Sequence, residues 1–349
     1  TPSTLAERGD GPLAGVALRY ACGLAGFVDG DAPLGLIGAF CVARLFSPAI
    51  VSGGSKNLAN GLARAAAAAG ARGLVSAEVR RVERDGDGFR LTLVDGREVK
   101  ARAVVSTLDP RSTFLELLAP ELAPEELREA ASGWELDGTG PFTAHFGIRG
   151  EPPAPAGGTE GDALVRVFGF ASADEVGEHF AAALRGELPA TVAGHLSVVS
   201  AHDRLQASPG PYGPLHTLRM QTHVPFEAPE PGWDRLRTEH RQRCWEALQE
   251  HFPELAEARL LFAFCDTPLD IERRFGTTRR GSIRQGALVP AQTLTARPHE
   301  SCSTGRTPVP GLYLGGGGVH PGVPGSLAGG HNVAALVAED LGLRSPGAR

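Results

Sequence analysis

The stretch that decides the fold lies near the end of the chain: VPGLYLGGGGVHPGVPGSLAGGHNVAALVAEDLGL, residues 309–343. The apolar run at 312–314 predicts a short buried strand, and the Ala- and Leu-rich end predicts a helix from about residue 325 to 341. Between them lie four consecutive glycines and a His-Pro-Gly-Val-Pro-Gly run. Because glycine has no side chain, another molecule can approach this backbone closely.

The predicted helix determines the chemistry of this loop. Its free N–H groups and positive dipole end point back at the glycines. This arrangement suits an electron-rich group, such as a phosphate or the N1–C2=O edge of a reduced flavin. The alternative is a tight turn that packs only against its own domain. The combined pattern of strand, four glycines, His-Pro-Gly-Val-Pro-Gly and helix favours ligand binding over that alternative.

Residues 311–341 (GLYLGGGGVHPGVPGSLAGGHNVAALVAEDL) closely resemble the C-terminal FAD motif of the bacterial phytoene desaturase and carotenoid isomerase group. These are flavin oxidoreductases with an amine-oxidase-like layout. Four further stretches resemble the family in the family's order, and they are SGGSKNLANGLARAAAAAGA with SAEVRRV (52–82), STLDPRSTFLELL (106–118), TPLDIERRFGTTRRGSI (267–283) and ARPHESCSTGRTPVPG (296–311). The resemblance therefore spans roughly residues 13–343.

The resemblance implies that FAD is the cofactor and assigns residues to it by position. Gly53 and Gly54 are expected to form a turn near the flavin, and Val79 to lie where backbone groups hold the adenine. The terminal loop contributes the rest of the expected cofactor-binding residues, which are Gly316, Gly317, Gly318, His320, Pro321, Gly322 and Val323 towards the ribityl and pyrophosphate side and Pro324 and Gly325 towards the ring. His320 is interpreted as structural and flavin-adjacent, with proton transfer as the less favoured role, and no catalytic residue is assigned.

The chain departs from the family in two places. It has no strand followed by GxGxxG, a helix and an acidic residue about 20 positions later, which is the usual ADP-binding unit. We therefore expect the ADP-binding half to come from a second polypeptide in a heterodimer, or from a longer protein cut before Thr1. The second departure is the run RRGSIRQGAL (279–288), where the family often has a His-Gly-Asp-like sequence. If that run faces the substrate, the chemistry could differ from desaturation.

The sequence predicts a helix after the Gly53-Gly54 turn, which Ser55 can cap, and then a three-strand meander that ends in an apolar strand at 103–107. A helical region is predicted at 111–132 and a further strand at 195–201. This order of predicted elements indicates an α/β fold. An incomplete Rossmann-like FAD domain is expected from residues 53–110 and 305–343. An α+β substrate domain, with a mixed or antiparallel sheet and helices, is expected from residues 1–52 and 111–304. Apolar helices predicted at 13–28 and 33–46 are either core elements or the lining of an apolar cavity.

Composition excludes several function classes. The net charge of −6 gives no basic footprint for nucleic acid. The five cysteines form no CxxC pair and no zinc-type cluster, so we expect reduced, mostly buried thiols in a cytoplasmic protein and no metal.

No apolar run reaches 18 residues, so no membrane-spanning helix is expected, although peripheral membrane contact stays open. The absence of GxSxG disfavours a serine hydrolase.

Two hypotheses follow for function. The first is an FAD-dependent oxidoreductase of the dehydrogenation or desaturation type, acting on an apolar or biosynthetic-intermediate substrate as one part of a split enzyme. The second is a non-catalytic, degenerate paralogue that serves as a scaffold or stabilises a catalytic flavoprotein partner. The glycine loop favours the first, because a chain freed from flavin contact has no evident need for four bare glycines.

Overall fold

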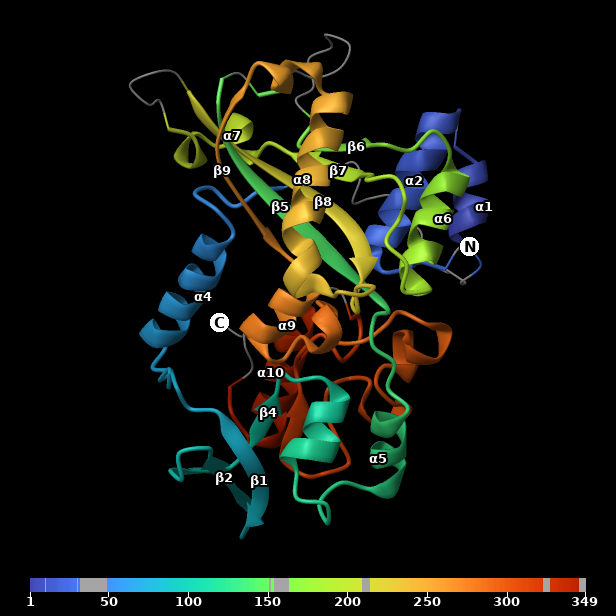
Figure 1. The fold of residues 1–349 in the computed structure, drawn as a ribbon. Helices are drawn as coiled ribbons and strands as arrows, with labels where there is room; N and C mark the ends of the chain where they lie inside the picture. The colour runs from blue at the N-terminus through green and yellow to red at the C-terminus, as the bar shows by residue number, and fades with distance from the viewer. Residues whose placement is uncertain are drawn as a thin grey trace. The chain divides into compact units, whose positions relative to one another are not determined.

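The computed structural model describes residues 1–9, 11–29, 31, 49–150, 152–153, 163–208, 214–322 and 327–344 (Figure 1). The chain divides into two compact units. The first unit comprises Thr1–Gly73 and Gly138–Arg273, and the second comprises Leu74–Asp137 and Arg274–Arg349. Each unit combines segments that are far apart in the sequence. The assignment of a flavin domain and a substrate domain to particular residues stays a prediction.

A five-stranded sheet forms the centre of the first unit, with its strands in the order β6-β7-β8-β5-β9. All neighbouring strands are antiparallel, which confirms the expected antiparallel sheet. The strands are β5 (Thr139–Arg149), β6 (Val165–Phe168), β7 (Gly194–Ser197), β8 (Leu215–Pro225) and β9 (Arg259–Asp266). The strand predicted at 195–201 is shorter than expected, because the chain turns after Ser197 into the one-turn helix α7 (Val199–His202).

Helix α8 (Trp233–His251) covers one face of this sheet. Successive residues of a strand point to opposite faces, so alternate residues of β5 and β8 pack towards the helix. Together they form one core, made largely by Phe142, Ala144, Phe146, Ile148, Leu218, Met220, Trp233, Cys244, Trp245 and Leu248. The intervening residues of these strands, among them His145 and Arg219, therefore face the opposite side of the sheet.

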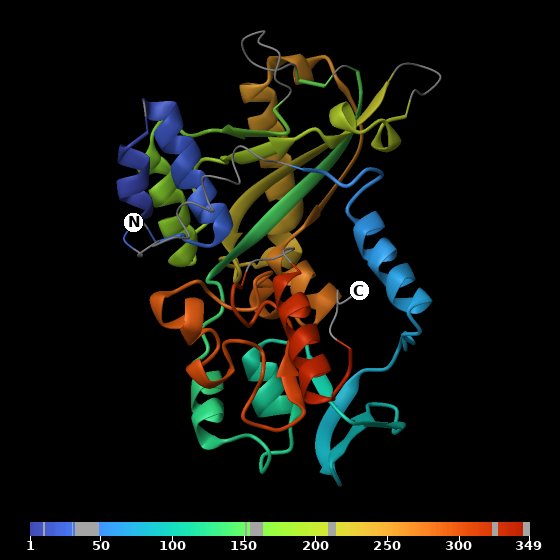
Figure 2. The same cartoon turned by 180° about the vertical axis from the view of Figure 1, so that it is seen from behind.

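Three helices form a group of their own beside the β6, β7 and β8 strands (Figure 2). They are α1 (Pro2–Glu7), α2 (Pro12–Ala25) and α6 (Ala173–Leu184). Tyr20 and Phe180 are buried where α2 and α6 pack together. The helix predicted at 13–28 is confirmed as α2, whereas the helix predicted at 33–46 lies outside the described residues.

Helix α4 (Lys56–Ala68) confirms the helix predicted after the Gly53-Gly54 turn, but none of its residues is buried. Leu58 and Leu62 are each 46% exposed. The suggestion that Ser55 caps this helix is wrong, because its side chain makes no capping hydrogen bond. Ser55 itself has helical dihedral angles, φ −57° and ψ −27°, whereas a capping residue normally has an extended backbone.

The second unit contains two small sheets. β1 (Val79–Asp85), β2 (Gly88–Leu93) and β3 (Glu98–Ala101) form the predicted antiparallel meander. β4 (Val104–Ser106) pairs in parallel with β10 (Leu312–Leu314), so that the two apolar strands expected in the FAD domain lie side by side. A buried core that includes Val82, Phe89 and Phe114 joins the meander to this strand pair.

The helical region predicted at 111–132 is divided in the structure. It contains a π-helical segment, η1 (Ser112–Leu117), and the helix α5 (Glu125–Ser132). Asp109 starts the first segment, because its carboxylate accepts the Ser112 amide at 2.9 Å and the Ser112 hydroxyl at 2.6 Å. The predicted C-terminal helix is α10 (Ala328–Asp340).

The remaining elements are short. They are α9 (Pro268–Phe275) and the 3-10 turns Arg204–Gln206, Pro253–Ala256, Arg279–Gly281, Pro290–Gln292, Leu294–Ala296 and Glu300–Cys302. Among the residues that the structure describes, no helix combines the length and apolar character needed to cross a membrane. Four cysteines are described, and all are buried free thiols: Cys22, Cys244, Cys265 and Cys302.

Candidate functional site

The glycine loop lies between β10 and α10, as the sequence predicted. The amide of Gly315 donates to the carbonyl of Ser106 at 2.8 Å, which extends the β4–β10 pairing by one step. The amide of Gly317 donates to the side chain of Gln285 at 2.7 Å. The amides of Gly316 and Gly318 donate to no other described residue. These two N–H groups therefore fit a bound electron-rich group.

The same glycines are also required by the packing of the second unit. A Cβ atom at Gly316 would overlap the carbonyl oxygen of Thr107, and one at Gly318 would lie 2.8 Å from Cδ of Pro110. Gly317 is equally tight, because its Cβ would lie 2.8 Å from a backbone carbonyl oxygen. The interpretation that only flavin contact explains bare glycines here is therefore wrong, since contacts within the protein already exclude side chains.

Arg297 holds this loop from a fully buried position, with 0% exposure. Its guanidinium donates to the carbonyl of Gly317 at 2.9 and 3.1 Å. Its other donors reach the carbonyl oxygens of Arg284, Gly286, Ala287 and Gln292 at 3.0 to 3.3 Å. Burial lowers the pKa of Arg297 to about 10, so the side chain stays charged at neutral pH. Sequence reasoning missed Arg297, because a single arginine in an irregular segment forms no motif.

The run that departs from the family pattern contacts the loop through Gln285. Its side-chain amide donates to the Thr107 carbonyl at 2.9 Å while its oxygen accepts the Gly317 amide. Arg284 beside it forms a buried ion pair with Asp137 at 2.9 Å. Gln285 thus bridges the segment after β4 and the segment after β10. The suggestion that this run faces the substrate stays a prediction.

The other expected site residues lie in different settings. His320 is exposed and Pro321 is half-buried, while Gly322 is buried beside the Arg297 side chain with φ +70°. Val79 is the half-buried first residue of β1. Three of the expected residues lie outside the described part of the chain, namely Val323, Pro324 and Gly325.

The Gly53-Gly54 turn belongs to the first unit. Both residues adopt positive φ angles, +74° and +103°, which favour glycine. The carboxylate of Asp203 holds the turn, accepting the Gly53 amide at 2.5 Å and the side chain of Gln206 at 2.9 Å. These hydrogen bonds lower the pKa of Asp203, and the bond from Gln206 has the largest effect. Sequence reasoning missed this aspartate, which no local pattern connects to a turn about 150 residues earlier.

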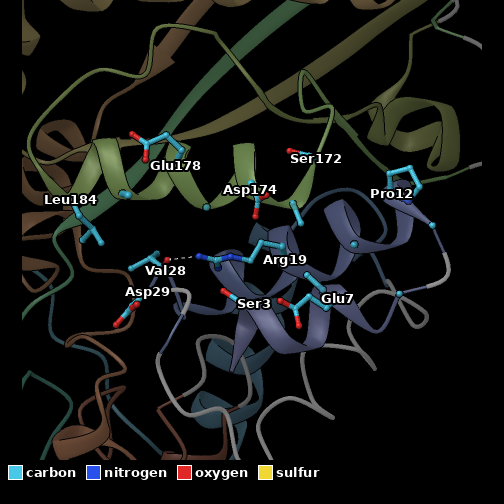
Figure 3. A pocket seen from close by; sticks show the side chains of 17 residues that line it. Ser3, Glu7, Pro12, Arg19, Val28, Asp29, Ser172, Asp174, Glu178 and Leu184 are labelled. Carbon is cyan, nitrogen blue, oxygen red and sulfur yellow. Dashed lines mark hydrogen bonds between the residues drawn. The ribbon is translucent and has the colours of Figure 1, made fainter.

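A pocket of about 790 Å³ lies between α1, α2 and α6 in the first unit (Figure 3). Four exposed carboxylates line it, those of Glu7, Asp29, Asp174 and Glu178. The buried Arg19 also lines it, but its guanidinium donates to the backbone carbonyls of Phe27 and Val28 at 3.2 and 2.8 Å. Because this cation already binds carbonyl groups and the carboxylates are solvated, we assign the pocket no ligand.

The chain matches known proteins over most of its length. Residues 33–341 match the model of the flavin containing amine oxidoreductase family. One of the subunits of limonene dehydrogenase from Castellaniella defragrans is 29% identical over 314 residues, which cover 86% of this chain and 57% of the relative. Pyridine nucleotide-disulfide oxidoreductase domain-containing protein 2 of Mus musculus is 30% identical over a region that covers 83% of this chain and 51% of that protein. Phytoene desaturase (lycopene-forming) of a Paracoccus species is 26% identical over a region that covers 83% of this chain and 55% of that enzyme.

Solved structures share the fold. An oxidoreductase from Methanosarcina mazei superimposes with a TM-score of 0.54 at 16% identity, covering 90% of this chain and 62% of the other. A putrescine oxidase variant gives a TM-score of 0.54 at 15% identity, covering 98% and 67%.

The fold and the family match agree on a class. The chain belongs to the flavin-containing amine oxidoreductase family, and its cofactor is FAD. This confirms the resemblance to phytoene-desaturase-like flavoproteins and the predicted α/β architecture. The chain spans about half the length of the curated relatives it matches, 51% to 57% of each.

Proposed function

We propose that this chain is one part of an FAD-dependent oxidoreductase that dehydrogenates or desaturates an apolar or biosynthetic-intermediate substrate. The observation that carries the proposal is the pair of amides at Gly316 and Gly318, which lie between β10 and α10 and donate to no other described residue. Bound flavin supplies the redox chemistry by accepting a hydride from the substrate. The residues of this chain bind and orient the cofactor through the backbone of the glycine loop, which Arg297 and Gln285 hold in place.

A further ADP-binding segment completes the site. Parallel strands normally occur in sheets that are covered on both faces. Here the parallel pair β4–β10 has only three residues per strand, and Val105 in it is 41% exposed. Helix α10 likewise leaves Ala334 and Ala335 exposed and Leu336 half-buried. These features support an additional layer of protein against this pair.

We place that segment on a second polypeptide, in a heterodimer. The limonene dehydrogenase relative is itself named as one of several subunits, which supports such a division. The buried free thiols Cys22, Cys244, Cys265 and Cys302 support a reducing compartment such as the cytoplasm.

The second candidate function is a non-catalytic scaffold that stabilises a catalytic flavoprotein partner. One observation favours it: the contacts of Gly316 and Gly318 with Thr107 and Pro110 explain the glycines without any flavin. A scaffold could therefore retain the loop for packing alone.

The test is the composition and colour of the complex purified from its natural source. The proposal expects stoichiometric flavin, seen by visible absorption and identified as FAD after extraction, together with a chain that carries GxGxxG. Substrate-dependent bleaching of the flavin would establish activity. A colourless stoichiometric complex would leave the scaffold, and a yellow single-chain protein with an additional N-terminal segment would remove the heterodimer but keep the flavin site.

A further inference from the structure

The sheet face opposite α8 carries a row of polar residues. The strand register places Ser197, Arg219, His145 and Phe264 side by side, one residue from each of β7, β8, β5 and β9. Directly paired residues share a face of the sheet, so these four side chains lie on the same side. The row ends in an aromatic ring on the edge strand β9.

Arg219 is the charged member of this row, and it is partly buried. Among the residues that the structure describes, its side chain makes one hydrogen bond, to the side-chain oxygen of Gln221, and no ion pair. A guanidinium has five N–H donors in a planar fork that matches a carboxylate. Most of the hydrogen-bonding capacity of Arg219 is therefore unused by the described residues.

The groups that face Arg219 do not neutralise it. Tyr20 on α2 interacts electrostatically with Arg219, and burial raises the pKa of its hydroxyl, which keeps it neutral. That hydroxyl is 3.0 Å from Nδ1 of His195. Burial lowers the pKa of His195 to about 3, so this histidine is also neutral. A buried charge normally has a counter-charge, and here the described residues supply none.

An aromatic surface lies on the other side of His145 from Arg219 in the row. Phe264 stacks on His145, with ring centres 4.5 Å apart and planes within 10°. Phe262 lies over Gly147, where any side chain would overlap its ring. The two phenyl rings are 6.3 Å apart and nearly parallel, and they are 51% (Phe262) and 49% (Phe264) exposed. A flat aromatic surface therefore lies one strand beyond His145 from a cation that no described residue neutralises.

We propose that this face binds an apolar molecule that bears a carboxylate, with the carboxylate on Arg219 and the hydrocarbon part on Phe262 and Phe264. The pairing of charge with apolar surface selects this ligand over a pure hydrocarbon, which would leave the guanidinium desolvated and without an anion. This inference depends on the proposed function in one respect: if the chain is part of the proposed oxidoreductase, the molecule bound at this face is its substrate.

Octanoate and 1-octanol are suitable probes, because they share the chain and differ in charge. Calorimetry on the purified complex should detect octanoate binding, and 1-octanol should bind more weakly. Arg219→Gln should weaken octanoate binding by about 30-fold or more, as expected when one partner of a desolvated charge pair is removed. Arg219→Lys should recover part of this loss. Arg185→Gln is the matched control, because Arg185 is exposed and pairs with Glu178 and Glu187.

Several results would overturn the proposal: no octanoate binding, equal binding of octanol by the wild-type protein, or unchanged octanoate binding by Arg219→Gln. Thermal unfolding without ligand provides a second readout. Removing an unpaired buried charge should leave the midpoint unchanged or higher, and a fall of several degrees would mean that Arg219 is already paired. Flavin content separates the proposed redox function from the proposed ligand site. A colourless complex that binds octanoate through Arg219 contradicts the redox function and leaves the ligand site standing.

Discussion

The guanidinium of Arg297 donates two hydrogen bonds, 2.9 and 3.1 Å long, to the carbonyl oxygen of Gly317. The amide of the same glycine is bound by the side chain of Gln285. Both backbone polar groups of Gly317 are thus held by side chains, while the amides of Gly316 and Gly318 on either side donate to no other described residue. The shape of the candidate flavin-binding backbone is therefore set by residues outside the glycine motif.

Arg297→Met should unfold or strongly weaken the second unit and abolish flavin retention. The substitution leaves the carbonyl oxygens of Arg284, Gly286, Gln292 and Gly317 without a described donor, while that of Ala287 keeps the bond from the Gln292 side chain. Removing one member of a buried charged network costs about 3–5 kcal/mol, and chemical denaturation measures it. Arg128→Met is the control, because Arg128 is exposed and its 3.4 Å contact with Glu125 contributes about 0.5 kcal/mol or less. Equal stability of the two variants would contradict this role of Arg297.

The glycine loop and its flanking elements could be predicted from the sequence, because each is a local signal. A three-residue apolar strand, a glycine run and an Ala-rich helix follow one another between 312 and 340. The side chains that hold the loop could not be predicted. Arg297 and Gln285 act from irregular segments that have no hydrophobic periodicity, and their partners are backbone atoms that leave no mark in the sequence.

The row of polar residues on the sheet is visible in the amino-acid sequence. In LHTLRMQTHVP (215–225) the polar residues Arg219, Gln221 and His223 alternate with residues of the other face, which indicates a strand with one polar face. The alternation does not reveal which strand supplies the neighbours of Arg219. That pairing depends on strand order, and β9, which carries the aromatic residues, lies about 40 residues further along the chain, beyond α8.

Gln285→Glu should destabilise the second unit by about 1–3 kcal/mol at neutral pH. The new carboxylate can still accept the Gly317 amide, but it cannot donate to the Thr107 carbonyl, which Gln285 reaches at 2.9 Å. Protonation of the glutamate restores a donor, so the difference from wild type should shrink as the pH falls from 7 to 5. Urea denaturation of both proteins at the two pH values measures this. A difference that does not depend on pH would mean that the Thr107 bond contributes nothing.

A pair of glycine substitutions separates packing from ligand contact. Gly316→Ala should destabilise the protein even without flavin, because its Cβ overlaps the Thr107 carbonyl. Gly330→Ala should not, because no described atom lies within 4 Å of a Cβ there, and alanine favours a helix by about 1 kcal/mol over glycine. If flavin or its ADP-binding segment contacts the first turn of α10, Gly330→Ala should lower flavin content while the thermal midpoint stays equal or rises. Unchanged flavin content would place the cofactor away from this turn.

Acid should destabilise the first unit through three buried histidines. Burial lowers the pKa of His179 and His240 to about 4 and that of His195 to about 3. The unfolded chain binds protons near pH 6.5 while the folded unit does not, so stability is highest above that pH and falls between about 6.5 and 4. In the folded unit His179 and His240 protonate near pH 4 and His195 near pH 3, so the loss levels off below about pH 3. Each histidine contributes about 3 kcal/mol to this loss.

His240 isolates one part of this effect. Its ring packs against Phe142, with ring centres 4.6 Å apart, and neither ring nitrogen has a hydrogen-bond partner among the described residues. His240→Phe should therefore reduce the loss of stability between pH 7 and pH 4.5 by about 2–3 kcal/mol. His251→Phe, on the same helix α8 but exposed, should leave the pH dependence as in wild type. Urea unfolding at the two pH values measures both, and an identical pH dependence in His240→Phe would mean that His240 is solvated or paired in solution.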